Sequence, residues 1–266
     1  MEPFYFDTQP GSLFGIYHPP VREQVRTVGV VLCYPMGQEY IRAHRAFRHL
    51  GECLAGQGFP TLRFDYFGCG DSEGACEEGT LAQWRRDIIR AVDTLQSGSE
   101  ISQVALVGLR LGGALALDAA ASVDTVSSVL LWDPIVSGME YVRELAALER
   151  TWVQQSFARK TPRHSSKDPD ESTGFPLTPS VKQELRPLDL LRRPIDPPEH
   201  LGIVTCQEGG RYDAFVSQLQ KIGLSVGVRF IPESKVWIKD KNQLETRLVP
   251  RETIQAIVSW LCEVDG

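Results

Sequence analysis

Apolar residues follow two patterns that alternate along the chain. Short continuous apolar runs, typical of strands covered on both faces, are separated by longer segments in which apolar residues recur every three or four positions, typical of amphipathic helices. The predicted strands span residues 13–17, 28–34, 60–64, 104–108, 127–132, 201–206 and 226–231. The predicted helices span residues 43–56, 81–96, 111–121, 212–222 and 252–262. This alternation indicates βαβ units and a mostly parallel sheet.

One region interrupts the alternation. From about Gly138 to Pro198 no segment has a good strand pattern. A helical pattern over residues 140–158 leads into RKTPRHSSKDPDESTGFPLTPS, a polar segment rich in proline and serine that buries little apolar surface. We therefore expect residues 1–266 to form a single α/β domain that carries residues 138–198 as a partly flexible insertion.

The segment VALVGLRLGGALAL, residues 104–117, joins a strand to a helix through a glycine-rich turn. Gly108 ends the strand, Arg110 occupies the turn, and Gly112 and Gly113 open the helix. The same order occurs in the G-x-S-x-G turn, where a serine nucleophile is exposed between strand and helix. Arg110 stands where that pattern places the serine.

Two further motifs support a family resemblance. YPMGQEY (34–40) resembles the loop after the third strand that builds part of an oxyanion hole, and RFDYFGCGDSEG (63–74) resembles a D-x-x-G-x-G-x-S block after the fourth strand. With the turn at Arg110, they make the chain similar to α/β-hydrolases of the serine aminopeptidase and monoacylglycerol lipase type. The resemblance implies an α/β-hydrolase fold: a mostly parallel eight-stranded sheet flanked by helices, with a lid inserted between strands six and seven. GLRLG followed by LLWDP also resembles a divergent hydrolase branch found beside exosortase systems.

The catalytic triad of such enzymes requires a nucleophile, an acid and a histidine, in that chain order. Arginine is always protonated and has no acceptor lone pair, so Arg110 cannot be the nucleophile. The family resemblance places the histidine after the last strand, but residues 232–250 contain none. The five histidines are His18, His44, His49, His164 and His200. The sequence therefore predicts a degenerate triad.

The acid position has three candidates. Asp133 directly follows the strand at 127–132 and is the best match to a carboxylate at the end of a strand. Glu208 and Asp213 follow the next strand of the sheet and are the alternatives.

Three interpretations of Arg110 follow. In the first, its guanidinium and the free N–H groups of a helix N-terminus bind a small anionic acyl or carboxylate ligand. The residues predicted to line that site are Met36, Gly37, Arg110, Leu111 and Trp237. In the second, an internal ion pair with Asp133 or Glu208 fills the site and the protein is a scaffold, for which the resemblance to the exosortase-associated branch implies a polysaccharide-export or biosynthetic pathway. In the third, the chain is still a hydrolase or acyltransferase acting on an ester, thioester or amide through an unconventional nucleophile. The candidates for that nucleophile are Cys33, Cys69, Ser72 and Cys206.

Charge and composition limit the classes of partner that the protein can have. The formal net charge of the 266 residues is -6 and no long basic block occurs, which argues against nucleic acid. No apolar run approaches the roughly 20 residues of a membrane span, and no secretory signal is evident. The six scattered cysteines form no metal motif and indicate reduced thiols in a cytoplasmic protein. We expect no metal and no cofactor, whereas a protein partner or a homodimer stays open.

Overall fold

The chain is described from a computed structural model, which covers residues 1–21, 25–155, 170–196, 198–207, 209, 211–233, 235–237 and 249–264. Among these residues, one sheet of eight strands has the order β1-β2-β4-β3-β5-β6-β9-β10. Its strands are β1 Glu2–Asp7, β2 Ser12–His18, β3 Val28–Cys33, β4 Thr61–Phe64, β5 Gln103–Leu109, β6 Val126–Trp132, β9 His200–Thr205 and β10 Val226–Phe230. Strands β1, β2 and β4 pair antiparallel and the remaining neighbours pair parallel. The predicted sheet is confirmed. The pattern analysis missed β1, an edge strand that is mostly exposed.

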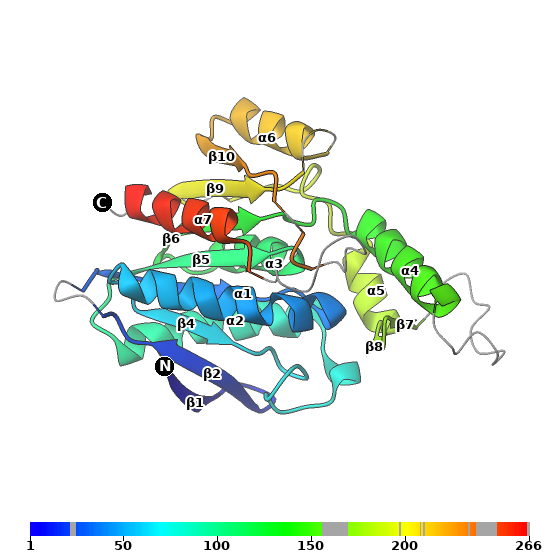
Figure 1. The fold of residues 1–266 in the computed structure, drawn as a ribbon, viewed down its shortest axis with the longest axis horizontal. Coiled ribbons are helices and arrows are strands. Elements are labelled where there is room, and N and C mark those ends of the chain that lie inside the picture. The colour runs from blue at the N-terminus through cyan, green and yellow to red at the C-terminus, as the bar shows by residue number, and fades with distance from the viewer. Residues whose placement is uncertain are drawn as a thin grey trace.

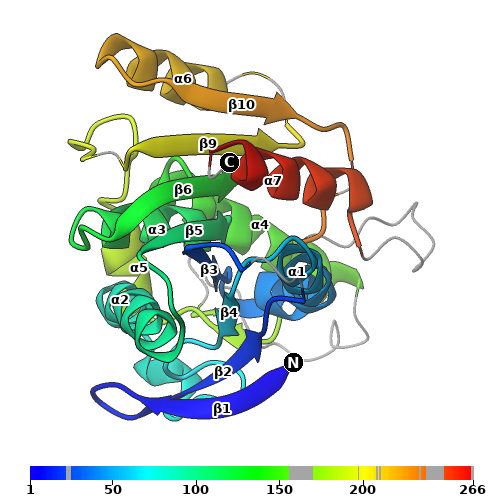
Figure 2. The same cartoon turned by 90° about the vertical axis from the view of Figure 1, so that its left-hand side faces the viewer.

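Helices cover both faces of the sheet. They are α1 Gly37–Gly56, α2 Leu81–Gly98, α3 Leu111–Ala120, α4 Gly138–Gln155, α5 Pro179–Leu185, α6 Arg211–Lys221 and α7 Arg251–Val264, with a 3₁₀ turn η1 at Cys76–Glu78. Helices α1 and α7 lie on one face, and α2 and α3 on the other (Figure 2). The central strands are apolar on both sides as a result, and all six residues of β3 are buried. This is the α/β-hydrolase fold.

The segment between β6 and β9 lies beyond the carboxyl ends of the parallel strands (Figure 1). It contains α4, a short hairpin of β7 Glu171–Ser172 and β8 Phe175–Pro176, and α5. The polar segment that the sequence predicted to be partly flexible lies here. From Asp170 onward it contains the hairpin and α5, and Lys182 Nζ contacts Asp170 Oδ1 at 2.9 Å. The earlier part of the polar segment, including His164, lies outside the described residues.

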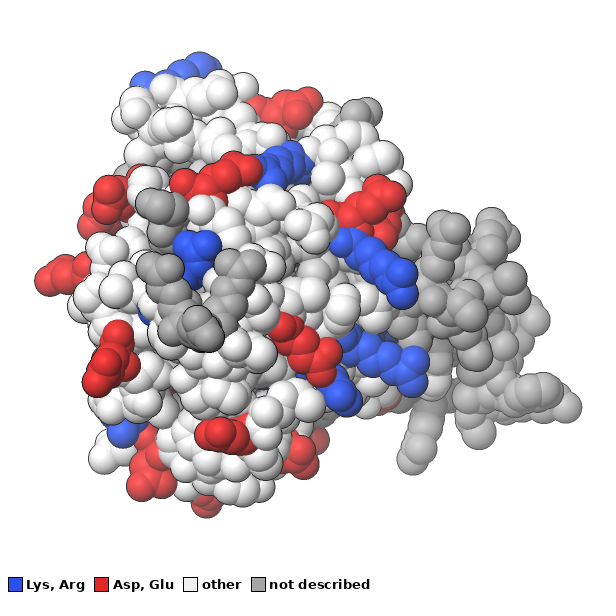
Figure 3. All heavy atoms as spheres, turned by 60° about the vertical axis from the view of Figure 1, so that its left-hand side comes forward, with Lys and Arg blue, Asp and Glu red and all other residues white. Residues whose placement is uncertain are grey.

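Acidic and basic side chains are interspersed on the face of the molecule shown in Figure 3. Within the described part of the chain, no helix is long and apolar enough to cross a membrane. The same residues contain no group of three or more His, Cys, Asp or Glu that could hold a metal ion.

Candidate functional site

Arg110 occupies the sharp turn between β5 and α3. Its backbone has φ 55° and ψ -119°, the left-handed φ region that a non-glycine residue rarely adopts. The turn is fixed by its own backbone, since Arg110 N donates to Trp132 O at 2.9 Å and Gly113 N donates to Arg110 O at 3.1 Å. A side chain at Gly112 would collide with the carbonyl groups of Cys33 and Tyr34, so only glycine lets the helix approach β3 this closely. The chain thus keeps the strained geometry of a nucleophile turn and presents a guanidinium on it.

The guanidinium is held by two carboxylates. Arg110 Nε donates to Glu39 Oε1 at 3.2 Å, and Arg110 Nη2 donates to Glu144 Oε2 at 2.7 Å. Tyr141 supports the first pair by donating its hydroxyl to Glu39 Oε2 at 2.9 Å. The aromatic rings of Tyr141 and Trp237 lie 5.4 and 5.1 Å from the Arg110 Cζ atom. The positive charge of Arg110 is therefore neutralised by two carboxylates, and its guanidinium also contacts two aromatic rings.

The two carboxylates differ in origin and exposure. Glu39 sits in the first turn of α1, where the helix dipole favours a negative charge, and its side chain is 4% exposed. Glu144 comes from α4 and its side chain is 37% exposed. Burial raises the pKa of Glu39, and the charge of Arg110 opposes that shift. Although burial alone would lower the pKa of Arg110, Glu39 and Glu144 together raise it, so the guanidinium stays charged.

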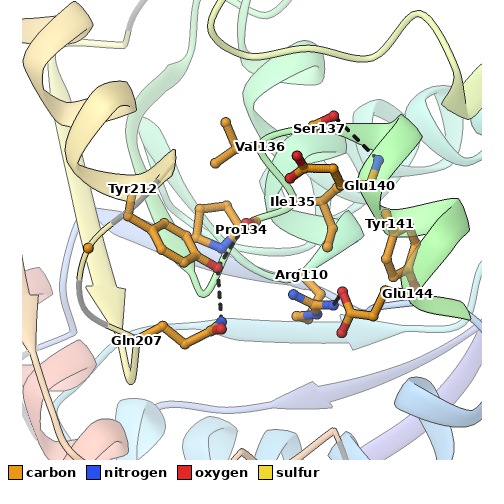
Figure 4. Close-up of a pocket in the computed structure, with 11 residues that line it drawn as sticks. Arg110, Pro134, Ile135, Val136, Ser137, Glu140, Tyr141, Glu144, Gln207 and Tyr212 are labelled. Carbon is orange, nitrogen blue, oxygen red and sulfur yellow. Dashed lines mark hydrogen bonds and ion pairs between the residues drawn. The ribbon is translucent and has the colours of Figure 1, made fainter. Parts of the chain in front are cut away.

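A cavity of about 270 Å³ opens beside Arg110 (Figure 4). Its lining comes from the turn after β5, the loop after β6, α4, the loop after β9 and α6, and consists of Arg110, Pro134, Ile135, Val136, Ser137, Glu140, Tyr141, Glu144, Gln207, Gly209 and Tyr212. In the close-up, Arg110 and Glu144 point toward one another across the floor of the cavity. Tyr212 bridges the opposite wall, because its hydroxyl donates to Pro134 O and accepts from Gln207 Nε2, both at 3.2 Å. The cavity combines one cation, carboxylates and an apolar wall.

Asp133, the first candidate for the acid, is held through one of its two carboxylate oxygens. Its Oδ1 accepts from Thr205 Oγ1 at 2.9 Å and from the Cys206 backbone N–H at 3.0 Å. Its other oxygen, Oδ2, is buried and has no hydrogen-bond partner in the described structure. Burial raises the pKa of Asp133. One oxygen of this carboxylate is therefore fixed by β9 and the residue after it, and the other has no partner within the described residues.

Among the described residues, Arg110 does not pair with Asp133, one of its two expected partners. Its observed partners are Glu39 and Glu144, whereas Asp133 is held by β9 and the residue after it. Glu208 lies outside the described residues, and Asp213 is exposed on α6 and does not line the cavity.

The residues predicted to bind a ligand lie around the turn, and Arg110 is the one that lines the cavity. Met36 and Leu111 are buried at the N-termini of α1 and α3. Phe175 of the β7–β8 hairpin lies next to Gly37. Trp237 packs on the Arg110 guanidinium, and its buried Nε1 has no partner in the described structure.

The sequence analysis missed Glu39 and Glu144. Glu39 carried a usable signal, because beginning α1 at Gly37 would have placed this carboxylate in the first turn. Glu144 carried a weaker one, since it follows Glu140 by one helical turn on α4.

Comparisons with known proteins agree with the fold. The model of the family described as serine aminopeptidase, S33, matches residues 30–186. A segment of 63 residues is 48% identical to the mitochondrial palmitoyl-protein thioesterase ABHD10 of Homo sapiens, and covers 24% of this chain and 19% of that protein. The match thus spans about a fifth of the relative's length.

Two solved structures superpose over nearly the whole chain. Est1E from Butyrivibrio proteoclasticus, with ferulic acid bound, has a TM-score of 0.66 at 17% identity and covers 98% of both chains. Alpha/beta hydrolase domain-containing protein 10 from mouse has a TM-score of 0.59 at 18% identity, over 99% of this chain and 98% of that one. At these identities the likeness shows the fold alone.

Proposed function

Because the chain belongs to the serine aminopeptidase S33 family of α/β-hydrolases, we propose that it uses the family's nucleophile turn to bind a ligand and not to cleave one. Arg110 cannot attack a carbonyl, and no histidine follows His200 in the sequence. The ligand is a small acyl molecule with a carboxylate that pairs with Arg110. No serine–histidine chemistry is involved.

The observation that carries this proposal is the asymmetry of the two carboxylates on Arg110. Glu39 is buried and tied to Tyr141, so it stays in place. Glu144 is half-exposed, lies on the cavity wall and contacts Nη2 at 2.7 Å. A ligand carboxylate can take the position of Glu144 and keep the guanidinium neutralised. Residues 138–198 then act as a lid whose own carboxylate fills the site until a ligand arrives.

Hydrolysis through an unconventional residue has less support. Thioester cleavage is suggested by the name of the human relative, and a thiol nucleophile would need a lowered pKa. Burial instead raises the pKa of Cys33 and of Cys69, and raises that of Cys206 to about 12. These thiols stay protonated at neutral pH and are poor nucleophiles. The Ser72 hydroxyl is engaged by the backbone, since it donates to Asp65 O at 2.6 Å.

A scaffold is the second candidate, and the internal ion pairs of Arg110 favour it. The two proposals differ in what Glu144 does. In a scaffold the ion pair is permanent, whereas in a ligand-binding protein it is exchanged.

The test is calorimetric titration of the purified protein with octanoate and with octanamide, which has the same shape but no charge. We expect octanoate to bind at least about tenfold more tightly than octanamide, because a charge-assisted contact contributes about 1.5–3 kcal/mol. Glu144→Gln should tighten octanoate binding about fivefold, since it weakens the internal competitor by about 1 kcal/mol. Arg143→Met, a change at an exposed position next to Glu144 on α4, serves as the control and should leave binding unchanged.

Two results would overturn the proposal. Equal affinity for acid and amide, or no binding of either, would favour the scaffold. Covalent labelling by a fluorophosphonate, or turnover of a palmitoyl thioester, would show that a nucleophile is active.

A further inference from the structure

We propose that a second cavity, at the paired strands β2 and β4, binds a small monocarboxylate through Arg63. The cavity has a volume of about 190 Å³ and is lined by Phe14, Ile16, Tyr34, His44, Arg63, Phe64, Asp65 and Asp71. None of these residues lines the cavity beside Arg110. The inference is therefore independent of the function proposed above.

Arg63 is a buried cation with neutral partners. Arg63 is 5% exposed, and its Nε donates to His18 Nε2 at 3.0 Å. Nη1 donates to the Tyr34 hydroxyl over a longer 3.4 Å. Burial, together with the charge of Arg63, lowers the pKa of His18 to about 4, so the imidazole is neutral at pH 7. Within the described residues, no carboxylate lies within ion-pair distance of Arg63.

An unpaired buried charge is costly, because desolvation removes several kcal/mol of hydration that no counter-charge restores. Nε and Nη1 of the guanidinium donate to these two neutral acceptors, and no hydrogen bond from Nη2 is found among the described residues. An oxyanion bound there would supply the missing counter-charge. A carboxylate oxygen can accept a charge-assisted hydrogen bond from Nη2.

The walls of the cavity define the rest of the ligand. Phe14 and Ile16 from β2 and the rings of Tyr34 and Phe64 suit an apolar or aromatic body. Asp65 also lines the cavity, with Oδ1 accepting from the Tyr40 hydroxyl at 2.8 Å and Oδ2 from the Asp71 N–H at 3.1 Å.

Asp65 and Asp71 also line the cavity, and their negative charges disfavour a dianion. The geometry therefore selects a carboxylate with one charge over a phosphate.

The probe is benzoate, with benzamide as its uncharged match and inorganic phosphate as the dianion. We expect benzoate to bind the unmodified protein at least tenfold more tightly than benzamide or phosphate. At the cavity beside Arg63, Arg63→Met should abolish the difference between benzoate and benzamide. Arg45→Met, at an exposed position of α1, should preserve it.

A measurement on the unmodified protein keeps the test independent of how the variants fold. Benzoate should shift the ring signals of His44 in the NMR spectrum and leave those of His49 unchanged, because His44 lines the cavity and His49 on the same helix does not. A His44 signal that does not move, or a preference for benzoate over benzamide that Arg63→Met leaves in place at this cavity, would overturn the assignment. Phosphate binding more tightly than benzoate would overturn the ligand class.

Discussion

Two arginines are buried at the carboxyl edge of the sheet, and their surroundings differ. Arg110, at the end of β5, contacts two carboxylates at 3.2 and 2.7 Å. Arg63, inside β4, contacts an imidazole at 3.0 Å and a phenol at 3.4 Å. Both residues are at most 5% exposed, so burial alone does not decide how a charge is compensated.

The difference follows from where each arginine lies. Arg110 projects from a turn, where the first turn of α1 and the face of α4 bring acidic residues to it. Arg63 lies within a strand, and the register of β2 against β4 pairs it with Ile16 and places His18 two residues along. The strands and the residue after β3 supply the neutral acceptors of Arg63, whereas two helices supply the carboxylates of Arg110. The same residue type is thus held by carboxylates in one place and by neutral groups in the other.

Removing Arg110 should have the largest effect on stability. Arg110→Met leaves Glu39 buried without its counter-charge, and we expect a loss of about 3–5 kcal/mol at pH 7. The pKa of Glu39 is already raised by burial, so its contribution to stability is greatest below its ordinary pKa and falls as the pH rises through the folded value. The deficit of the variant should therefore shrink as the pH falls toward 4. Urea unfolding across this pH range measures both effects, and a loss below about 1 kcal/mol would contradict the charge pairing.

The next comparison is between the stability losses caused by replacing Glu39 and Glu144, the two carboxylates that contact Arg110. Glu39→Gln should cost about 2 kcal/mol, because it removes the buried counter-charge and weakens the bond from Tyr141. Glu144→Gln should cost less than about 1 kcal/mol, since a partly exposed pair is screened by water. Thermal and urea unfolding of the two variants provide the measurement. Equal losses would mean that Glu144 is as fixed as Glu39 and would weaken the exchange proposed for the ligand.

The structural features that could be predicted from the sequence are those set by residues close together in the chain. The strand, turn and helix around Arg110 were predictable because glycine spacing and apolar runs act within a few residues. The ion pairs were not, because Glu39 depends on where α1 begins and Glu144 on how a distant segment folds back over the sheet. The role of Arg63 was also beyond local reasoning, since its neutral partners arise from the register of two strands separated by more than 40 residues.

Removing Arg63 should have a small effect on stability, in contrast to Arg110. Arg63→Met removes an unpaired buried charge together with two bonds to neutral groups, and we expect a net change within about 1 kcal/mol at pH 7. A loss of about 3 kcal/mol or more would reveal a counter-charge and remove the contrast between the two arginines.

The same variant should alter the acid stability of the protein. The pKa of His18 is lowered to about 4 in the fold, so stability is present above its ordinary value of about 6.5 and is lost as the pH falls toward 4. Without the repulsion from Arg63, His18 should accept a proton at higher pH. Arg63→Met should then lose less stability between pH 6.5 and 4 than the unmodified protein, and NMR titration of His18 reports the pKa directly.

The smallest effect is expected at Asp133, a third buried charge, whose Oδ2 has no partner in the described structure. Asp133→Asn can keep an acceptor at the Oδ1 position for Thr205 and Cys206, so stability at pH 7 should be unchanged or higher by less than about 1 kcal/mol. The pKa of Asp133 is raised by burial, so its contribution is full below about 3.9 and is lost as the pH rises through the folded value. The amide of the substituted side chain cannot titrate, and this variant should lose less stability than the unmodified protein between pH 4 and 7. A clear loss at pH 7 in urea unfolding would instead show that the Asp133 carboxylate, like Glu39, compensates Arg110 across the site.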